Sequence, residues 1–167
     1  SKEGLAHLPL TCVQEGDNVL VPDLGYPVYG QATILAGGRP RPYRLAVETA
    51  YRPQTAALSG LCDARTRLLY LNYPHNPTGA TADRDLWHEI ASFAAERDLV
   101  LVNDAAYLEI VHGETPAVSL LACADHRRQR VIEFHSLSKM FNMTGWRVAF
   151  AVGHPEVIEA LARVKES

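Results

Sequence analysis

The sequence predicts a three-layer α/β/α sandwich built on a mostly parallel sheet. Short, continuously apolar runs alternate with segments whose apolar residues recur at helical spacing, and buried parallel strands are typically unbroken apolar runs. This alternation is typical of an α/β fold with helices on both faces of the sheet. The length of 167 residues suffices for one well-packed domain, and no internal repeat or linker divides it.

The expected strands are short and bounded by turn-forming residues. Gly16 opens a turn before the apolar run 18–21. Residues 39–45 are expected at an edge of the sheet, because Pro40 and Pro42 cannot donate a backbone hydrogen bond. The full set of expected strands is 18–21, 39–45, 67–71, 99–102, 131–135 and 147–152.

Apolar periodicity and capping residues define the expected helices. Pro9 is expected to kink the first helix, and Gly37 to end the second. Asp83 is an N-cap for a helix that runs to about Arg97 with one apolar face. The expected helices are 2–14, 28–36, 54–61, 83–97, 117–124 and 156–165.

One connection breaks the alternation. Too few residues lie between 131–135 and 147–152 for a helical crossover. These two strands are therefore either antiparallel neighbours or not adjacent.

Composition narrows the class of protein. Hydrophobic and charged fractions of 47% and 21% are those of an ordinary globular protein, and no apolar run is long enough to span a bilayer. The first residues lack a signal-peptide core, and a net charge of −3 with scattered basic residues offers no nucleic-acid surface. Three widely spaced cysteines fit reduced thiols in the cytoplasm, and no histidine pair has metal-ligand spacing. A cytoplasmic protein without nucleic-acid, membrane or metal partners is expected.

The stretch from Ser136 to Arg147 carries the strongest chemical signal. A lysine held among apolar neighbours, as expected for Lys139, loses hydration as an ammonium, so its free amine becomes available for Schiff-base chemistry. The serines and the Arg147 fork on the same turn suit a dianionic phosphate. Together they describe a lysine that binds a phosphorylated aldehyde. The structural alternative is a solvated loop lysine and an arginine at the rim of a strand.

Other polar residues follow the expected strands. Tyr26, Asn76, Asp104 and Lys139 each come shortly after a different one. Ligands of open α/β sheets bind beyond the carboxyl ends of the strands. We therefore expect these four side chains on one rim of the sheet.

This ordered set resembles that of fold-type I aminotransferases, which carry pyridoxal 5'-phosphate. The resemblance rests on a stacking aromatic, Asn-Pro-Thr-Gly at 76–79, Asp-x-x-Tyr at 104–107, and Ser-x-Ser-Lys at 136–139 followed by Met-Thr-Gly-Trp-Arg. It runs the whole length of the chain and implies the large cofactor-binding domain of that family. The implied cofactor contacts are Tyr26, Asn76, Asp104, Tyr107, Ser136, Lys139 and Arg147, with Ser1 and Lys2 at the start of the first helix.

Chemistry assigns these residues their parts in the implied site. Asp104 would pair with a protonated pyridine nitrogen, Asn76 and Tyr107 would donate to the phenolic oxygen, and Tyr26 would stack on the ring. Ser1 stands where helix N–H groups favour an anion. Each has a structural alternative: an Asx turn for Asp104, a turn former for Asn76, an N-cap for Ser1, and packing for the two tyrosines.

The resemblance implies a transaminase that moves an amino group between an amino acid and a 2-oxo acid. Residues 1–8, 103–110, 133–139 and 142–147 are most similar to the bacterial LL-diaminopimelate aminotransferase branch, which implies lysine biosynthesis with glutamate and tetrahydrodipicolinate as substrates. It also implies that residues 1–167 are the central part of the large domain, without the N-terminal arm and the C-terminal small domain, in a homodimeric parent. The alternatives are an alanine- or aspartate-type aminotransferase, a β-lyase, a cyclopropane-forming synthase, or a non-catalytic binding domain.

Overall fold

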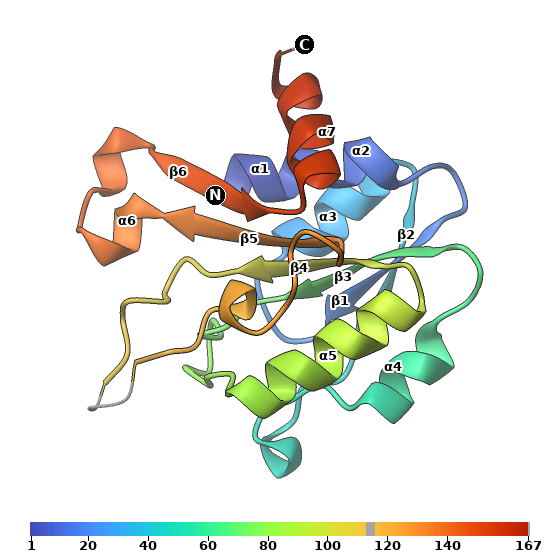
Figure 1. Ribbon diagram of the computed structural model, residues 1–167, viewed down its shortest axis with the longest axis horizontal. Helices are drawn as coiled ribbons and strands as arrows, with labels where there is room; N and C mark the ends of the chain where they lie inside the picture. The colour runs from blue at the N-terminus through green and yellow to red at the C-terminus, as the bar shows by residue number, and fades with distance from the viewer. Residues whose placement is uncertain (113–115, 167) are drawn as a thin grey trace.

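The computed structural model describes residues 1–112 and 116–166, and its centre is a six-stranded sheet (Figure 1). The strand order is β2-β1-β3-β4-β5-β6, with the first five strands parallel and the last one antiparallel to β5. The strands are β1 (Asn18–Pro22), β2 (Arg39–Tyr43), β3 (Thr66–Leu71), β4 (Val100–Asp104), β5 (Val131–Ser136) and β6 (Ala149–Gly153). The mostly parallel sheet and the edge position of β2 are confirmed.

Helices cover both faces of this sheet. In Figure 1, α4 and α5 lie below it, and α1, α2, α3 and α7 lie above it. The helices are α1 (Lys2–His7), α2 (Pro9–Cys12), α3 (Val28–Leu35), α4 (Thr55–Leu61), α5 (Arg84–Glu96), α6 (Leu137–Met140) and α7 (Pro155–Glu166), with 3₁₀ turns η1 (Val47–Thr49), η2 (Leu120–Ala122) and η3 (Thr144–Trp146). The three-layer arrangement is the one the sequence predicts.

Alternation along the strands divides the apolar residues between two cores. In β4, Leu101 packs into the core under α5, whereas Val100 and Val102 pack into the core under α1, α3 and α7. Trp87 of α5 is the largest fully buried side chain and fills the first of these cores. Burial of both strand faces explains why the strands are continuously apolar.

Local signals set most helix boundaries. The Asp83 carboxylate accepts a hydrogen bond from the Leu86 amide at 2.8 Å and so caps α5 as expected. The expected first helix is divided at Leu8 into α1 and α2, because Pro9 has no N–H to continue the hydrogen-bonding pattern. Gly37, with φ of +84°, ends α3 in a left-handed conformation that glycine adopts without strain.

Two connections differ from a simple alternating fold. The sequence left open whether the strands now seen as β5 and β6 are neighbours, and the structure shows that they are antiparallel neighbours. The helix expected over 117–124 is only the 3₁₀ turn η2. Its Leu120 amide donates to the buried Glu133 carboxylate at 2.9 Å, which ties this segment to β5.

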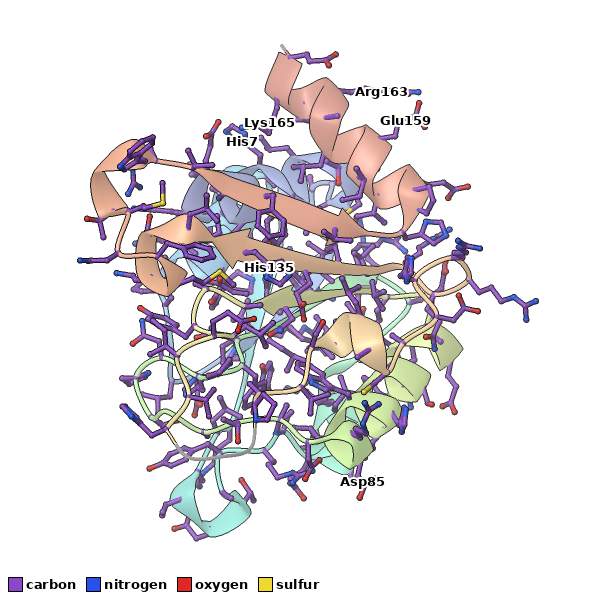
Figure 2. All side chains as sticks on the ribbon, turned by 60° about the vertical axis from the view of Figure 1, so that its left-hand side comes forward. His7, Asp85, His135, Glu159, Arg163 and Lys165 are labelled. Carbon is purple, nitrogen blue, oxygen red and sulfur yellow. The ribbon has the colours of Figure 1, made fainter. Side chains whose placement is uncertain are left out.

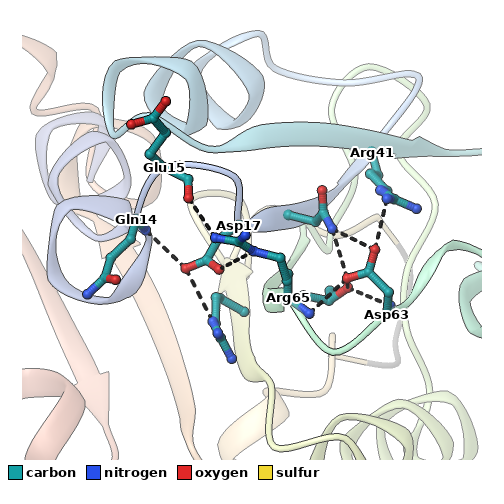
Figure 3. Close-up of polar contacts among 9 residues, drawn as sticks. Gln14, Glu15, Asp17, Arg41, Asp63 and Arg65 are labelled. Atoms are coloured by element: carbon teal, nitrogen blue, oxygen red, sulfur yellow. Dashed lines mark hydrogen bonds and ion pairs between the residues drawn. The ribbon is translucent and has the colours of Figure 1, made fainter.

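Charged residues gather at the amino end of the sheet (Figure 3). Asp17 accepts hydrogen bonds from the Gln14 amide at 3.1 Å and Arg65 Nε at 3.5 Å, and lies 3.3 Å from Arg67 Nε. Asp63 pairs with Arg41 at 2.9 Å. This end of the sheet is held by matched charges.

None of the helices within residues 1–112 and 116–166 is long and apolar enough to cross a membrane.

Candidate active site

A cavity of about 700 Å³ lies at the carboxyl ends of β1, β3, β4 and β5. The side chains singled out in the sequence come to it from strand ends, loops and short helices far apart in the chain. Its lining includes Ser1, Lys2, Tyr26, Asn76, Asp104, Tyr107, Ser136, Lys139 and Arg147. The structure therefore brings together all nine predicted site residues, and what they bind stays a prediction.

Asp104 is the buried carboxylate of this cavity. It ends β4, is 6% exposed, and accepts a hydrogen bond from the Tyr29 hydroxyl to Oδ2 at 2.9 Å. Its Oδ1 is also buried and has no hydrogen-bond partner within the described part of the chain. Burial raises the pKa of Asp104, while Tyr29 and the nearby Ala106 amide act in the opposite direction. An incompletely satisfied buried acceptor is the feature a cationic donor would complete.

Two site residues were not predicted from the sequence. Tyr29 is 1% exposed and contacts Asp104 directly, and Asn72 also lines the cavity. The Asn72 side chain donates to the Asp104 carbonyl at 2.7 Å and accepts from the Asn76 amide at 2.9 Å, so it joins the ends of β3 and β4. In the sequence, Asn72 could have been found because it directly follows an expected strand. Tyr29 could have been found because it lies three residues after Tyr26.

A second buried carboxylate lies on the other face of the sheet. Glu133 is fully buried, and although burial raises the pKa of Glu133, its hydrogen bonds lower it to below the ordinary value. Its partners are Asn103 Nδ2 at 3.0 Å, Ser119 Oγ at 2.7 Å, the Leu120 amide at 2.9 Å and His135 Nε2 at 3.0 Å. His135, labelled on β5 in Figure 2, also stacks on the Phe150 ring with centroids 4.8 Å apart. This network fixes the strand ends that carry Asp104 and Ser136.

The lysine segment forms a helical turn, α6, after β5. The Ser136 hydroxyl accepts a hydrogen bond from the Ser138 amide at 3.3 Å and so caps this turn. Lys139 Nζ lies 6.0 Å from the centre of the Tyr107 ring. The expectation that apolar neighbours enclose Lys139 is wrong for this chain, since Lys139 is exposed. The cause is that Phe141 and Trp146 are themselves 63% and 71% exposed and do not pack over it.

Two further positive side chains, those of Arg147 and Lys2, line the cavity. Arg147 has a left-handed backbone, with φ of +54°, and donates to the Thr144 carbonyl at 3.1 Å. Lys2 Nζ lies 5.8 Å from the centre of the Tyr26 ring. Ser1 occupies the N-cap position of α1, as its structural alternative expects, but its hydroxyl makes no capping hydrogen bond. Lysine and arginine at one cavity favour an anionic ligand.

The fold is an open α/β sheet with a charged cavity beyond its carboxyl ends, which is where proteins of this class bind their ligands. The chain belongs to the aminotransferase class I and II family, whose match covers residues 1–167. The resemblance of the sequence to aminotransferases is thereby confirmed.

Relatives of known name share much of the sequence. The LL-diaminopimelate aminotransferase of Desulforudis audaxviator is 46% identical over 167 residues, which are 100% of this chain and 42% of the relative. That of Moorella thermoacetica is also 46% identical over the whole chain, which covers 43% of its length. The chain thus spans less than half the length of these relatives.

Solved structures share the fold. A substrate-bound BacF structure from Bacillus subtilis has a TM-score of 0.92 at 36% identity, over 99% of this chain and 42% of that one. A probable N-succinyldiaminopimelate aminotransferase from Thermus thermophilus has a TM-score of 0.91 at 37% identity, over 99% and 44%. An aspartate aminotransferase from Thermotoga maritima has a TM-score of 0.92 at 25% identity, over 99% and 44%.

Proposed function

We propose that the natural protein containing this chain is an aminotransferase that uses pyridoxal 5'-phosphate. It would move an amino group between an amino acid and a 2-oxo acid. Family membership and the names of the relatives support this activity. The observation that carries it is the cavity at which Lys139 and a buried Asp104 with one unpartnered oxygen meet.

The donor set of the cavity fits the ring of this cofactor. Asp104 Oδ1 is a buried acceptor that a protonated pyridine nitrogen would satisfy. Tyr26 offers a flat face for stacking, and the side chains of Asn76 and Tyr107 can donate to the phenolic oxygen. These groups would bind the ring from its nitrogen edge, one face and its oxygen edge.

The phosphate has its own candidate residues. Arg147 and Lys2 supply positive charge at the cavity, and Ser1 and Ser136 supply hydroxyl groups. The Ser1 hydroxyl carries one O–H donor, which can donate to a phosphate oxygen. These four residues would hold the phosphate and so place the ring against Asp104.

Lys139 would perform the proton transfer. When bound, the cofactor supplies an electron sink for the negative charge that develops on the substrate α-carbon. The Nζ of Lys139 would hold the cofactor's carbonyl carbon and, once released, take the proton from the α-carbon as a base. Asp104 in its charged form would keep the ring nitrogen protonated during this transfer.

For the substrates, we propose tetrahydrodipicolinate with glutamate as the amino donor, giving LL-diaminopimelate and 2-oxoglutarate in lysine biosynthesis. The support is the recurrence of this name among relatives that are 39–46% identical over 99–100% of the chain. The second candidate is another amino-acid substrate, because solved structures named for N-succinyldiaminopimelate and aspartate have almost the same TM-scores. A β-lyase or a non-catalytic domain would give no amino transfer.

We also propose that the natural protein is a cytoplasmic homodimer without nucleic-acid or membrane partners, and that residues 1–167 are the central part of its large domain. Support for an assembly comes from the exposed apolar side chains of Phe141, Trp146 and Phe150 around the lysine segment. Further residues of the natural protein or a second subunit would cover them. The mixed surface charge and net charge of −3 support the absence of a nucleic-acid partner.

Covalent labelling tests the cofactor. The natural protein would be mixed with pyridoxal phosphate, reduced with borohydride, digested, and its labelled peptide identified by mass spectrometry. We expect the label on Lys139 and none in Lys139→Ala, with Lys165→Ala as the matched lysine control that keeps the label. Absence of label in the wild type would overturn the cofactor proposal.

A panel of amino donors, with LL-diaminopimelate and aspartate compared directly, then decides the substrate.

A further inference from the structure

The charged form of Asp104 is unfavourable in free energy, because its carboxylate is buried. Among the described residues, no arginine or lysine side chain forms an ion pair with it. Its side-chain partner is the Tyr29 hydroxyl at 2.9 Å. Burial and the neighbouring Asp104 raise the pKa of Tyr29 well above its ordinary value. The hydroxyl therefore keeps its proton and acts as a donor to Oδ2.

The Tyr29 ring also contacts the residue proposed to stack on the cofactor. The rings of Tyr29 and Tyr26 meet edge to face, with centroids 6.2 Å apart and planes at 86°. On its other side, Tyr29 stacks on Tyr70 with centroids 5.0 Å apart. Tyr70 is itself fixed, since its hydroxyl donates to the Leu5 carbonyl at 2.9 Å. Tyr29 is thus held in place and touches two proposed cofactor contacts.

We propose that Tyr29 is a positioning residue of this site: its hydroxyl holds one oxygen of Asp104, so that the other remains for a cationic ring nitrogen, and its ring braces Tyr26. The inference rests on the proposed function for the identity of that ring. The hydrogen bond favours the charged carboxylate, and charge on Asp104 is what a protonated nitrogen needs. Among the described residues, His135 and Tyr70 are further titratable groups that act electrostatically with Asp104.

The first test is a carbon-13 NMR titration of the Asp104 carboxyl group in the cofactor-free natural protein, with Asp104→Asn to assign the resonance. Tyr29→Phe keeps the ring and removes only the hydroxyl, so we expect the titration midpoint of Asp104 to rise by about one pH unit. Tyr43→Phe is the matched control. It removes another buried tyrosine hydroxyl, which donates to the Tyr70 carbonyl at 2.7 Å, and should leave the midpoint unchanged.

The second test separates the hydroxyl from the ring. We expect Tyr29→Phe to weaken pyridoxal phosphate binding about tenfold at pH 8, and Tyr29→Leu to weaken it further because Tyr26 also loses its brace. Equal dissociation constants for the Phe and Leu variants would contradict the bracing of Tyr26. A Tyr29→Phe protein with the wild-type midpoint for Asp104 would overturn the hydrogen-bonding part.

Failure of the proposed function gives a different pattern. If wild-type protein does not bind pyridoxal phosphate but Tyr29→Phe still shifts the Asp104 midpoint, the cofactor proposal is wrong and the hydrogen-bond inference stands. If the Tyr29→Phe protein does not fold, the hydrogen bond can be tested by an NMR titration of the wild-type protein instead. The Cζ resonance of Tyr29 should titrate with the midpoint of Asp104, and an independent midpoint would overturn the inference.

Discussion

Asp17 and Asp104 are buried aspartates at opposite ends of the same sheet, 4% and 6% exposed. Asp17 precedes β1 and is paired with the guanidinium groups of Arg65 and Arg67 (Figure 3). Asp104 ends β4 and has a neutral tyrosine hydroxyl as its side-chain partner. Similar burial thus comes with opposite electrostatic surroundings.

The pKa values differ in direction for this reason. At Asp17, burial acts to raise the pKa, but hydrogen bonds from the Gln14 amide, Arg67 and Arg65 outweigh it and lower the pKa below its ordinary value. At Asp104, burial outweighs the hydrogen bond from Tyr29 and raises the pKa. Where a buried carboxylate is paired with cations, removing one partner destabilises the fold, because it leaves an uncompensated charge. A buried carboxylate without such cations is suited to receive a cation from a ligand. Four experiments test this difference between Asp17 and Asp104.

The largest expected effect is that of Asp104→Asn on the cofactor. The amide can still accept from Tyr29 but offers no charge to a pyridinium, so affinity for pyridoxal phosphate should fall about 100-fold, equivalent to about 3 kcal/mol. The cofactor-free variant should unfold at the same temperature as the wild type or higher, because a buried charge is removed. Equilibrium dialysis and calorimetry measure the two quantities. Loss of both together would mean that Asp104 is structural, like Asp17.

Asp17→Asn should have the opposite result. Its amide nitrogen would face the arginine donors, so we expect the free energy of unfolding to fall by about 2 kcal/mol and the melting temperature by about 5 °C. Cofactor affinity, measured by dialysis, should not change, because Asp17 is at the far end of the sheet from the cavity. A shift in affinity larger than twofold would contradict this separation.

The pH dependence of stability should distinguish the two carboxylates by sign. The folded-state pKa of Asp17 is lowered, so its contribution is present above the ordinary value and is lost as pH falls through the folded pKa. The folded-state pKa of Asp104 is raised, so its contribution is lost as pH rises from the ordinary value through the folded pKa. Urea unfolding of wild type, Asp17→Asn and Asp104→Asn between pH 3 and 8 tests this. Differences from wild type that follow pH in the same direction would refute it.

Arg65→Ala should have the smallest effect. The Arg65 side chain is 59% exposed and its Nε lies 3.5 Å from Asp17, so solvent screens the pair. We expect a loss of less than about 1 kcal/mol in unfolding free energy, decreasing with added salt. A larger loss in a urea titration, or one insensitive to salt, would show that Asp17 depends on this one cation rather than on the whole network.

Several elements could be predicted because their signals are local. The prolines at 40 and 42 place β2 at the edge, Asp83 starts α5, and Pro9 divides the first helix, since each acts on its own backbone hydrogen bonds. The prediction of a helix over 117–124 was wrong, because the Leu120 amide donates its hydrogen bond to a carboxylate distant in the sequence, that of Glu133. No local pattern carries that contact.

The candidate site shows the same division. Residues such as Asn76 and Asp104 could be found because each follows a strand, and parallel strands bring their carboxyl ends to one rim. Tyr29 and Asn72 were missed, since their importance lies in hydrogen bonds to Asp104 that span 75 and 32 residues. The exposure of Lys139 was also not predictable, because it depends on whether Phe141 and Trp146 pack over it.

The sequence by itself predicted which residues are candidates for chemistry and at which end of the sheet they lie, because strands, turns and caps depend on short-range patterns. The tertiary structure decided which carboxylate is paired with arginines and which keeps one oxygen without a hydrogen-bond partner among the described residues. Both Asp17 and Asp104 adjoin apolar strands in the sequence, and only the folded chain places arginines beside one and a tyrosine hydroxyl beside the other. The physical reason is that charge pairing acts through space, over distances that the order of residues does not encode.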